Sequence, residues 1–339
     1  MIEPDRELSA LLARHWSIDA VLTEPARGTN NLMRIVHAAA DPAGRPLGLI
    51  RVYQNLDLDR VRREHRLLDR LAGAGLPFRV PRLRPADDGR TVIETGTGPV
   101  SLIDWIDGDR PDLDRPEALR AAGRALGRLD AALADVPAAE APFDWTTPDL
   151  ALAGIDDGRI DALADAGLAA EQVAWLRDHA GPPPRPDGLP LQVIHEDFAA
   201  SNLLAQGPPT VIAGVIDFEV AGRDLRANEL AIALDQTGAL DGPDWQQKTR
   251  ALATGYGEAV RLEQAEITEQ PRLIMGRTLG TVGWRTGRWL AGHDTLAEVA
   301  DRIEAARTAE RWLARNTTEL VELLHEGLSG ADLAVTLDQ

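Results

Sequence analysis

Polar side chains follow a short apolar run in the segment 193-VIHEDFAASNLL-204. The run has the character of a buried strand end, and His-x-Asp follows it, with Asn202 five residues after Asp197. A second apolar run, residues 211–216, leads directly into Asp217. Two strand ends would then each present a carboxylate, with a carboxamide between them. Such a set suits metal-assisted phosphoryl transfer, because carboxylate and amide oxygens are the ligands with which Mg²⁺ is held against phosphates.

Each of these residues has a simpler interpretation when it is taken alone. An aspartate after a strand often caps a helix or an Asx turn, and an asparagine often lies in a turn. An aspartate such as Asp217 can be a buried salt-bridge partner, and His195 alone is more typical of a structural histidine than of a base. The joint pattern of Asp197, Asn202 and Asp217 favours catalysis and metal binding over these alternatives.

The part of the chain that precedes this segment is rich in expected strands. Residues 32–37 and 47–53 flank a turn at residues 41–44 and predict an antiparallel hairpin. Residues 58–74 predict a charged amphipathic helix that ends at glycines. Further strands are expected at residues 91–95 and 99–106.

Helical segments dominate after Gly108, with helices predicted over residues 116–134 and 157–179 and from about residue 230 onward. We therefore expect an α+β protein of two lobes. A small β-rich N-lobe would comprise residues 1–103, and a large, mainly helical C-lobe would comprise residues 104–339.

The composition narrows the classes of partner. The chain of 339 residues has no cysteine, which excludes disulfides, thiolate zinc sites and cysteine nucleophiles. Its formal net charge of −18 disfavours nucleic acid and anionic membranes as partners, and it leans toward a cationic substrate. No segment approaches the about 18 uninterrupted apolar residues of a membrane span, and we expect a cytoplasmic protein. The sequence predicts no oligomeric state.

The pattern His195-x-Asp197-x4-Asn202, with Asp217 fifteen residues after the asparagine, resembles the catalytic and metal-binding segments of the aminoglycoside phosphotransferase/choline kinase superfamily. The run from Glu229 to Leu234 looks closer to its homoserine-kinase-like branch. The resemblance implies a protein-kinase-like bilobal fold. It also implies an ATP- and Mg²⁺-dependent kinase that phosphorylates a hydroxyl of a small molecule, such as a cationic amino alcohol, an amino sugar or an aminoglycoside.

The resemblance assigns roles to the residues that follow the two apolar runs. Asp197 would be the catalytic aspartate, Asn202 and Asp217 would bind Mg²⁺, and His195 would brace the catalytic loop. Asp224 and Glu229, in the segment that follows the metal aspartate, would be structural, because an acidic residue there commonly anchors a helix of the large lobe.

The resemblance also assigns the nucleotide-binding residues. Gly28, Thr29, Asn30 and Asn31, which precede a strand, resemble the nucleotide-covering loop. Arg51 stands where the superfamily has the basic residue that contacts phosphates, and Glu64 matches the helix glutamate that pairs with it; the list of nucleotide-binding residues is therefore Gly28, Thr29, Asn30, Asn31, Arg51 and Glu64.

Two positions depart from the superfamily's pattern. Lys248 is the only lysine of the chain, and Arg51 occupies the position usually given to lysine. An arginine can clamp phosphates bidentately, but it is planar and longer than a lysine. Glu196 stands where a small residue is common; its carboxylate either faces the substrate or points to solvent, and we expect the second. Two alternative functions stay open: a nucleotide-binding pseudokinase that acts as a regulator, and a nucleotidyl transferase on the same fold.

Overall fold

The structure is a computed structural model, and it describes residues 3–25, 31–146, 154–182 and 186–329. By its contacts the chain divides into two compact units, each of which is described by itself. Unit 1 contains Met1–Pro111, Val136–Pro142 and Asn202–Ala221, and unit 2 contains Asp112–Asp135, Phe143–Ser201 and Gly222–Gln339. The segment that carries Asn202 and Asp217 therefore belongs to unit 1, although it is flanked in sequence by unit 2. This grouping by contacts leaves the predicted lobe boundary between residues 103 and 104 a prediction.

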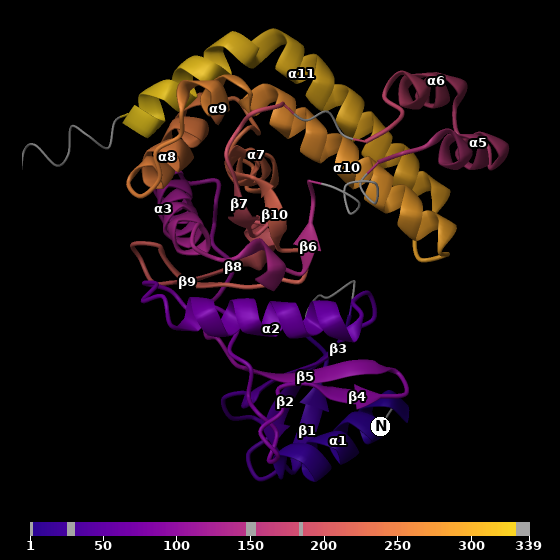
Figure 1. The fold of residues 1–339 in the computed structure, drawn as a ribbon, viewed down its shortest axis with the longest axis vertical. Coiled ribbons are helices and arrows are strands. Elements are labelled where there is room, and N and C mark those ends of the chain that lie inside the picture. The colour runs from indigo at the N-terminus through magenta and orange to yellow at the C-terminus, as the bar shows by residue number, and fades with distance from the viewer. Residues whose placement is uncertain (1–2, 26–30, 147–153, 183–185, 330–339) are drawn as a thin grey trace, which may run out of the picture. The chain divides into compact units, whose positions relative to one another are not determined.

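Unit 1 is built on a five-stranded antiparallel sheet with the order β1-β2-β3-β5-β4 (Figure 1). Its strands are β1 (Ala20–Thr23), β2 (Leu32–Ala38), β3 (Gly48–Val52), β4 (Ile93–Thr95) and β5 (Gly98–Asp104). The predicted hairpin is formed by β2 and β3, in which Met33 lies opposite Arg51. Its connection turns at Asp41, whose carbonyl accepts a hydrogen bond from the Gly44 N–H at 3.2 Å.

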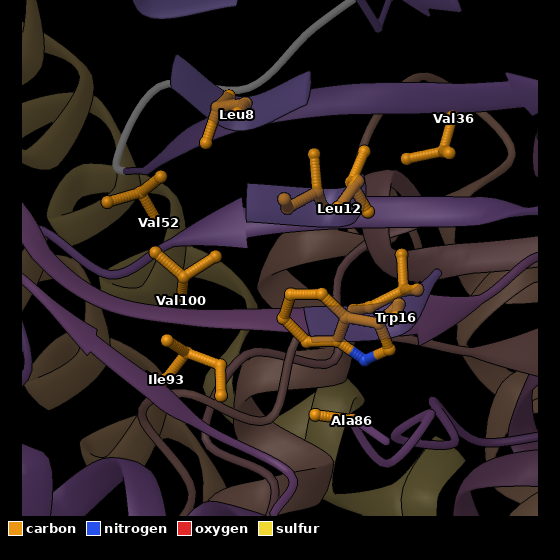
Figure 2. Packing of buried hydrophobic residues seen from close by; sticks show 10 residues of the cluster. Leu8, Leu12, Trp16, Val36, Val52, Ala86, Ile93 and Val100 are labelled. Carbon is orange, nitrogen blue, oxygen red and sulfur yellow. The ribbon is translucent and has the colours of Figure 1, made fainter. Parts of the chain in front are cut away.

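The helix α1 (Glu3–Trp16) covers one face of this sheet. Leu8, Leu12 and Trp16 follow one another at helical spacing, and all three are buried against sheet residues that include Val36 and Val100 (Figure 2). Burial of a large apolar side chain contributes about 1.5 to 3 kcal/mol, so this row fixes α1 on the sheet.

The helix α2 (Leu58–Ala72) begins where Asp57 caps it, with the Asp57 side chain accepting the Arg60 N–H at 2.9 Å. It ends at Ala72, two residues before the predicted end, and Gly73 is its C-cap. Its buried face consists of Val61, Leu67, Leu68 and Leu71, together with the charged Glu64 and with His65. A carboxylate inside an apolar stripe needs a partner, and Glu64 finds one on β3, as described below.

A second, two-stranded ribbon completes unit 1. It consists of β8 (Leu203–Gln206) and β9 (Val211–Val215), which pair antiparallel, and the short helix η1 (Ala138–Glu140) lies in the same unit. Leu203 pairs with Val215, so the residues that flank this pair, Asn202 and Ile216, are also neighbours. The Ile216 N–H donates to the Asn202 carbonyl at 2.9 Å.

Unit 2 contains a three-stranded sheet with the order β6-β10-β7 and most of the helices. Its strands are β6 (Phe143–Asp144), β7 (Leu191–Ile194) and β10 (Gly222–Leu225), and the short helix η2 (Ala200–Asn202) leads out of it. Its helices include α3 (Pro116–Leu133), α7 (Arg226–Gln236), α8 (Trp245–Gly257), the short α9 (Gln264–Thr268), α10 (Gln270–Leu290) and α11 (Leu296–Ser329). In Figure 1, α10 and α11 run beside each other, in orange and yellow.

The single helix predicted over residues 157–179 is wrong in one respect, because the structure divides it into α5 (Asp157–Asp165) and α6 (Ala170–Asp178). The break is at Gly167, whose φ of +96° lies outside the helical region. The division lets both helices bury side chains such as Ile160, Leu163 and Leu176 in a core with Val282 of α10 and Ile303 of α11.

The helices α3 and α8 approach each other through glycines. A Cβ atom on Gly123 would lie 2.0 Å from the Leu252 carbonyl oxygen, and one on Gly255 would lie 2.1 Å from the Arg120 carbonyl oxygen. Any larger residue at either position must push the two helices apart. Within the described residues, no helix is both long and apolar enough to cross a bilayer.

Candidate active site

The predicted catalytic loop starts in unit 2, at the end of β7. His195 is fully buried, and its Nδ1 accepts a hydrogen bond from the Asp197 N–H at 3.2 Å. The imidazole therefore holds the backbone on which the Asp197 carboxylate is carried. This contact helps to fix the position of Asp197.

Glu196 corrects one expectation of the sequence, because it does not point to solvent. It is only 6% exposed, and its backbone has a φ of +69°, in the left-handed region that glycine favours. Its N–H donates to Glu229 Oε2 at 2.9 Å. Glu229 is itself buried at the start of α7, so it anchors the turn that carries Asp197.

The electrostatics of Glu229 follow from this position. Burial raises the pKa of Glu229 to about 7, although the backbone N–H groups of Glu196 and His195 act in the opposite direction. Burial destabilises the carboxylate form and the two N–H groups stabilise it. The anchor of the catalytic turn is thus a carboxyl group that can be neutral near neutral pH.

Arg277, on α10, is a site residue that the sequence did not reveal. Its Nη2 donates to Asp197 Oδ1 at 2.9 Å, and the two side chains are 22% and 33% exposed. The contact joins residues that are 80 positions apart. No motif surrounds Arg277, and the only available signal is the regular placing of Arg277, Thr281, Arg285 and Arg288 along one helix.

The two predicted metal ligands lie in unit 1, at the base of the β8–β9 ribbon. Asn202 immediately precedes β8, and Asp217 follows β9 by two residues. Asp217 has a φ of +71°, in the left-handed region that aspartate adopts more readily than most residues other than glycine.

The chemistry of these two donors fits Mg²⁺. A carboxylate and a carboxamide supply hard oxygen atoms, and the Asp217 side chain is 38% exposed, so it is accessible to a ligand. Among the residues that the structure describes, no three His, Asp or Glu side chains gather as a complete metal cage.

Arg51, on β3, lies among three carboxylates of unit 1. Its Nη1 is 3.4 Å from Glu64 Oε1, and its Nη2 is 3.3 Å from Asp217 Oδ1. The same Nη2 donates to Glu219 Oε2. The structure thus joins Arg51 to Glu64, as the resemblance implied, and also to Asp217, a predicted metal ligand, and to Glu219.

Burial and charge oppose each other at this cluster. Burial disfavours the cation, but Glu64, Tyr53, Glu219 and Asp217 outweigh it and raise the pKa of Arg51. Burial raises the pKa of Glu64 to about 7 in spite of Arg51.

The neighbour of Glu64 on α2 has the opposite shift. Burial and the Arg51 charge lower the pKa of His65 to about 4. Neutral His65 is 3.2 Å from Ser101 Oγ and 3.3 Å from the Tyr53 hydroxyl, measured from its Nε2. The two neighbours on α2 thus have pKa shifts of opposite sign.

Glu219 is the second functional candidate that sequence reasoning did not assign, although it stands two residues after Asp217. Besides Arg51, its Oε2 accepts a hydrogen bond from Asn31 Nδ2 at 2.6 Å. Asn31 Oδ1 in turn accepts the Gln54 N–H at 3.1 Å. Of the predicted nucleotide-covering loop, Asn31 is therefore tied to this cluster, while Gly28, Thr29 and Asn30 lie outside the described residues.

Comparisons with known proteins agree with this geometry. A family model described as "Phosphotransferase enzyme family" matches residues 49–261. Homoserine kinase of Methylobacterium sp. (strain 4-46) is 30% identical over 242 residues, which cover 66% of this chain and 68% of that protein.

Two solved structures share the fold. A microcompartment-associated aminopropanol kinase superposes with a TM-score of 0.65 at 20% identity, over 93% of this chain and 100% of that chain. Amicoumacin kinase, in complex with AMP-PNP, Ca²⁺ and Ami, gives a TM-score of 0.64 at 15% identity, over 90% and 94% of the two chains. At these identities the likeness concerns the fold alone, and it confirms the predicted α+β, protein-kinase-like class.

Proposed function

This chain belongs to the phosphotransferase enzyme family, as a small-molecule phosphotransferase with an alcohol group as acceptor, and we propose that it transfers the γ-phosphoryl group of ATP in an Mg²⁺-dependent reaction. The observation that carries the proposal is the pair of carboxylates that follow strand ends and are held by neighbouring side chains, Asp197 after β7 and Asp217 after β9. The bond between the γ-phosphorus and the bridging oxygen breaks, and a bond forms from phosphorus to the alcohol oxygen. The products are ADP and a phosphate ester.

Asp197 is the residue that receives or orients the proton of the attacking hydroxyl. His195 and Glu229 support this role, because they hold the backbone on both sides of Glu196. Arg277 donates to Asp197 Oδ1 and keeps the carboxylate in place. A positioned base of this kind contributes about 10²- to 10⁴-fold to a rate.

Asn202 and Asp217 are the residues that would hold Mg²⁺, and the metal would neutralise the charge of the phosphates. Arg51 and the segment from Gly28 to Asn31 would position the same phosphates. For Arg51 this requires that phosphate oxygens take over donors now directed at Asp217 and Glu219. The planar guanidinium can do so with one edge while the other stays on Glu64.

We propose an amino alcohol as the acceptor. Homoserine and aminopropanol, after which the relative and the structural neighbour are named, both combine an amine with a hydroxyl. The net charge of −18 is compatible with a cationic amine.

Release of ADP is the measurement that tests the proposal. A coupled assay would compare homoserine, linear aminopropanol, choline and an aminoglycoside, with and without Mg²⁺, and with Asp197→Ala as the blank. We expect at least one alcohol to raise ADP release above the blank, and only in the presence of Mg²⁺. Release of pyrophosphate would contradict phosphoryl transfer. Binding of ATP without ADP release for any alcohol would contradict an enzymatic role.

A further inference from the structure

One face of α10 carries a row of polar residues, and the first of them, Arg277, contacts Asp197. Arg277, Thr281, Arg285 and Arg288 follow one another at intervals of three or four residues, so they share that face. Arg277 contacts Asp197 at 2.9 Å, which places Asp197 beside the first residue of the row. In a chain with a net charge of −18, three arginines along one helix are a local reversal of sign.

Arg302, on α11, adds a fourth guanidinium to this row. Its Nε donates to Thr281 Oγ1 at 2.7 Å, and the Thr281 hydroxyl donates to the Thr278 carbonyl at 2.7 Å. Both bonds of Thr281 are thus used to hold Arg302 in one orientation. The contact lies one helical turn beyond Arg277, about 6 Å along the helix axis at 1.5 Å per residue.

The four arginines differ in how their charge is compensated. Arg285 and Arg288 are both paired with Asp294, at 2.9 and 3.0 Å. Arg277 is paired with Asp197. Arg302 is the exception: within the described ranges no carboxylate lies at ion-pair distance from it, and its buried Nη2 has no hydrogen-bond partner.

An uncompensated guanidinium that is partly withdrawn from water is costly. Burial lowers the pKa of Arg302, Arg277 and Arg285 lower it further, and Asp235 is the acidic group that acts in the opposite direction. An anion from outside the chain would remove this cost, because it would supply the missing acceptor. A carboxylate suits the planar, bidentate donor set of a guanidinium.

We propose that Arg302, oriented by Thr281, binds the carboxylate of the acceptor, so that the substrate is a short-chain hydroxy amino acid rather than a simple amino alcohol. The proposal rests on the proposed function, in which the hydroxyl of the same molecule lies at Asp197. The offset of about one helical turn between Arg277 and Thr281 matches a short chain between hydroxyl and carboxylate. It names the group that distinguishes homoserine from linear aminopropanol, which has the amine and the hydroxyl but no carboxylate.

The test compares these two alcohols on three proteins. For the unaltered chain, we expect kcat/KM for L-homoserine to exceed that for linear aminopropanol about 10- to 100-fold, the usual effect of one charge-assisted hydrogen-bonding group. Arg302→Gln should lower kcat/KM for homoserine by a similar factor and leave that for aminopropanol within about twofold. Arg302→Lys should recover part of the loss. Arg311→Gln, on the exposed face of the same helix and paired there with Glu304, is the matched control and should change neither value.

Binding without nucleotide separates this proposal from the function on which it rests. Calorimetric titration with L-homoserine and with linear aminopropanol should show tighter binding of homoserine, and Arg302→Gln should abolish the difference. If no alcohol led to the release of ADP, the proposed function would fail. The titration would still show whether Arg302 binds the carboxylate. An equal loss for both alcohols in Arg302→Gln, or equal binding of both by the unaltered chain, would overturn the carboxylate site. The melting temperature of each variant shows whether it is folded.

Discussion

Two charged regions of the molecule have opposite imbalances of charge. In unit 1, one guanidinium, Arg51, lies among the carboxylates of Glu64, Asp217 and Glu219. In unit 2, the row along α10 and α11 has more guanidinium groups than paired carboxylates, and Arg302 has no acidic partner within the described residues. The first region has acid in excess and the second has base in excess.

The difference suggests how each region meets a ligand. An excess of carboxylates around Arg51 holds the side chain rigidly and leaves negative charge that a divalent cation can neutralise. An excess of arginines near Asp197 leaves positive charge that an anionic group can neutralise. Net charge, which sums the whole surface, shows neither feature.

The largest expected effect concerns Asp197, the carboxylate that Arg277 contacts. Asp197→Asn should lower kcat about 10²- to 10⁴-fold, because the amide cannot accept the proton while its shape and its contact with Arg277 are kept. Steady-state rates measure the loss, and an unchanged melting temperature excludes unfolding as its cause. Comparable turnover in Asp197→Asn and the unaltered chain would contradict the assignment of Asp197.

The next effect concerns the stability of the Arg51 cluster. Glu219→Gln should lower the free energy of unfolding by about 2 to 3 kcal/mol, since loss of one partner from a buried ion pair costs about 3 to 5 kcal/mol and Glu64 and Asp217 remain. Urea unfolding measures the change. Glu94→Gln is the control, because Glu94 is an exposed acid whose contact with Arg62 is 3.6 Å long. Equal stability of the Glu219 variant and the control would show that Arg51 does not depend on Glu219.

The pH dependence of stability separates two neighbours on α2. Glu64 has a folded pKa raised from 4.5 to about 7, so its contribution is present at low pH and is lost as the pH rises through this window. His65 has a folded pKa lowered from 6.5 to about 4, so its contribution is present above the unfolded pKa and is lost as the pH falls. The two contributions to the free energy of unfolding change with pH in opposite directions, each by up to about 1.4 kcal/mol per pH unit.

Single substitutions should therefore uncover each slope. Glu64→Gln should make stability rise more steeply with pH than in the unaltered chain, and His65→Asn should make it fall. Urea unfolding at several pH values between about 4 and 7 measures both, with the Glu229 titration common to all three proteins. Parallel curves for the three proteins would refute the opposed pair.

The smallest effect concerns Arg51, which stands where the superfamily usually has a lysine. Arg51→Lys should raise the KM for ATP about tenfold, or about 1.4 kcal/mol, because a compact ammonium cannot contact Glu64 with one edge and phosphates with the other. Initial rates at varied ATP concentration measure it. A lower KM in the lysine variant would mean that Arg51 impairs nucleotide binding in this chain.

Local patterns in the sequence predicted the local parts of the structure. The β2–β3 hairpin follows from two apolar runs around a turn at Asp41, and α2 follows from an N-capping aspartate, an apolar stripe and terminal glycines. The fold class followed from the order of such segments and from the resemblance at Asp197, Asn202 and Asp217. The break at Gly167 was missed, because periodicity continues on both sides of it.

The contacts that complete the candidate site could not be read in this way. Glu219 meets Asn31 over 188 positions and Arg277 meets Asp197 over 80, and neither spacing is a property of any motif. The burial of Glu196 depends on the Glu229 anchor, 33 positions away. Pairings of this kind are set by the tertiary fold, so a single sequence carries no local signal for them.

The β8–β9 ribbon changes how the interval between Asn202 and Asp217 should be understood. Because the two residues sit at the open end of a hairpin, the number of residues between them records only the length of the ribbon. Lengthening the tip, residues 207–210, by a few residues would leave Asn202 and Asp217 where they are, at an entropic cost of about 0.6 kcal/mol per doubling of the loop. A change of one residue within a strand would instead turn every following side chain to the other face. Searches for related proteins should therefore allow this interval to vary at the tip and hold the register at its base fixed.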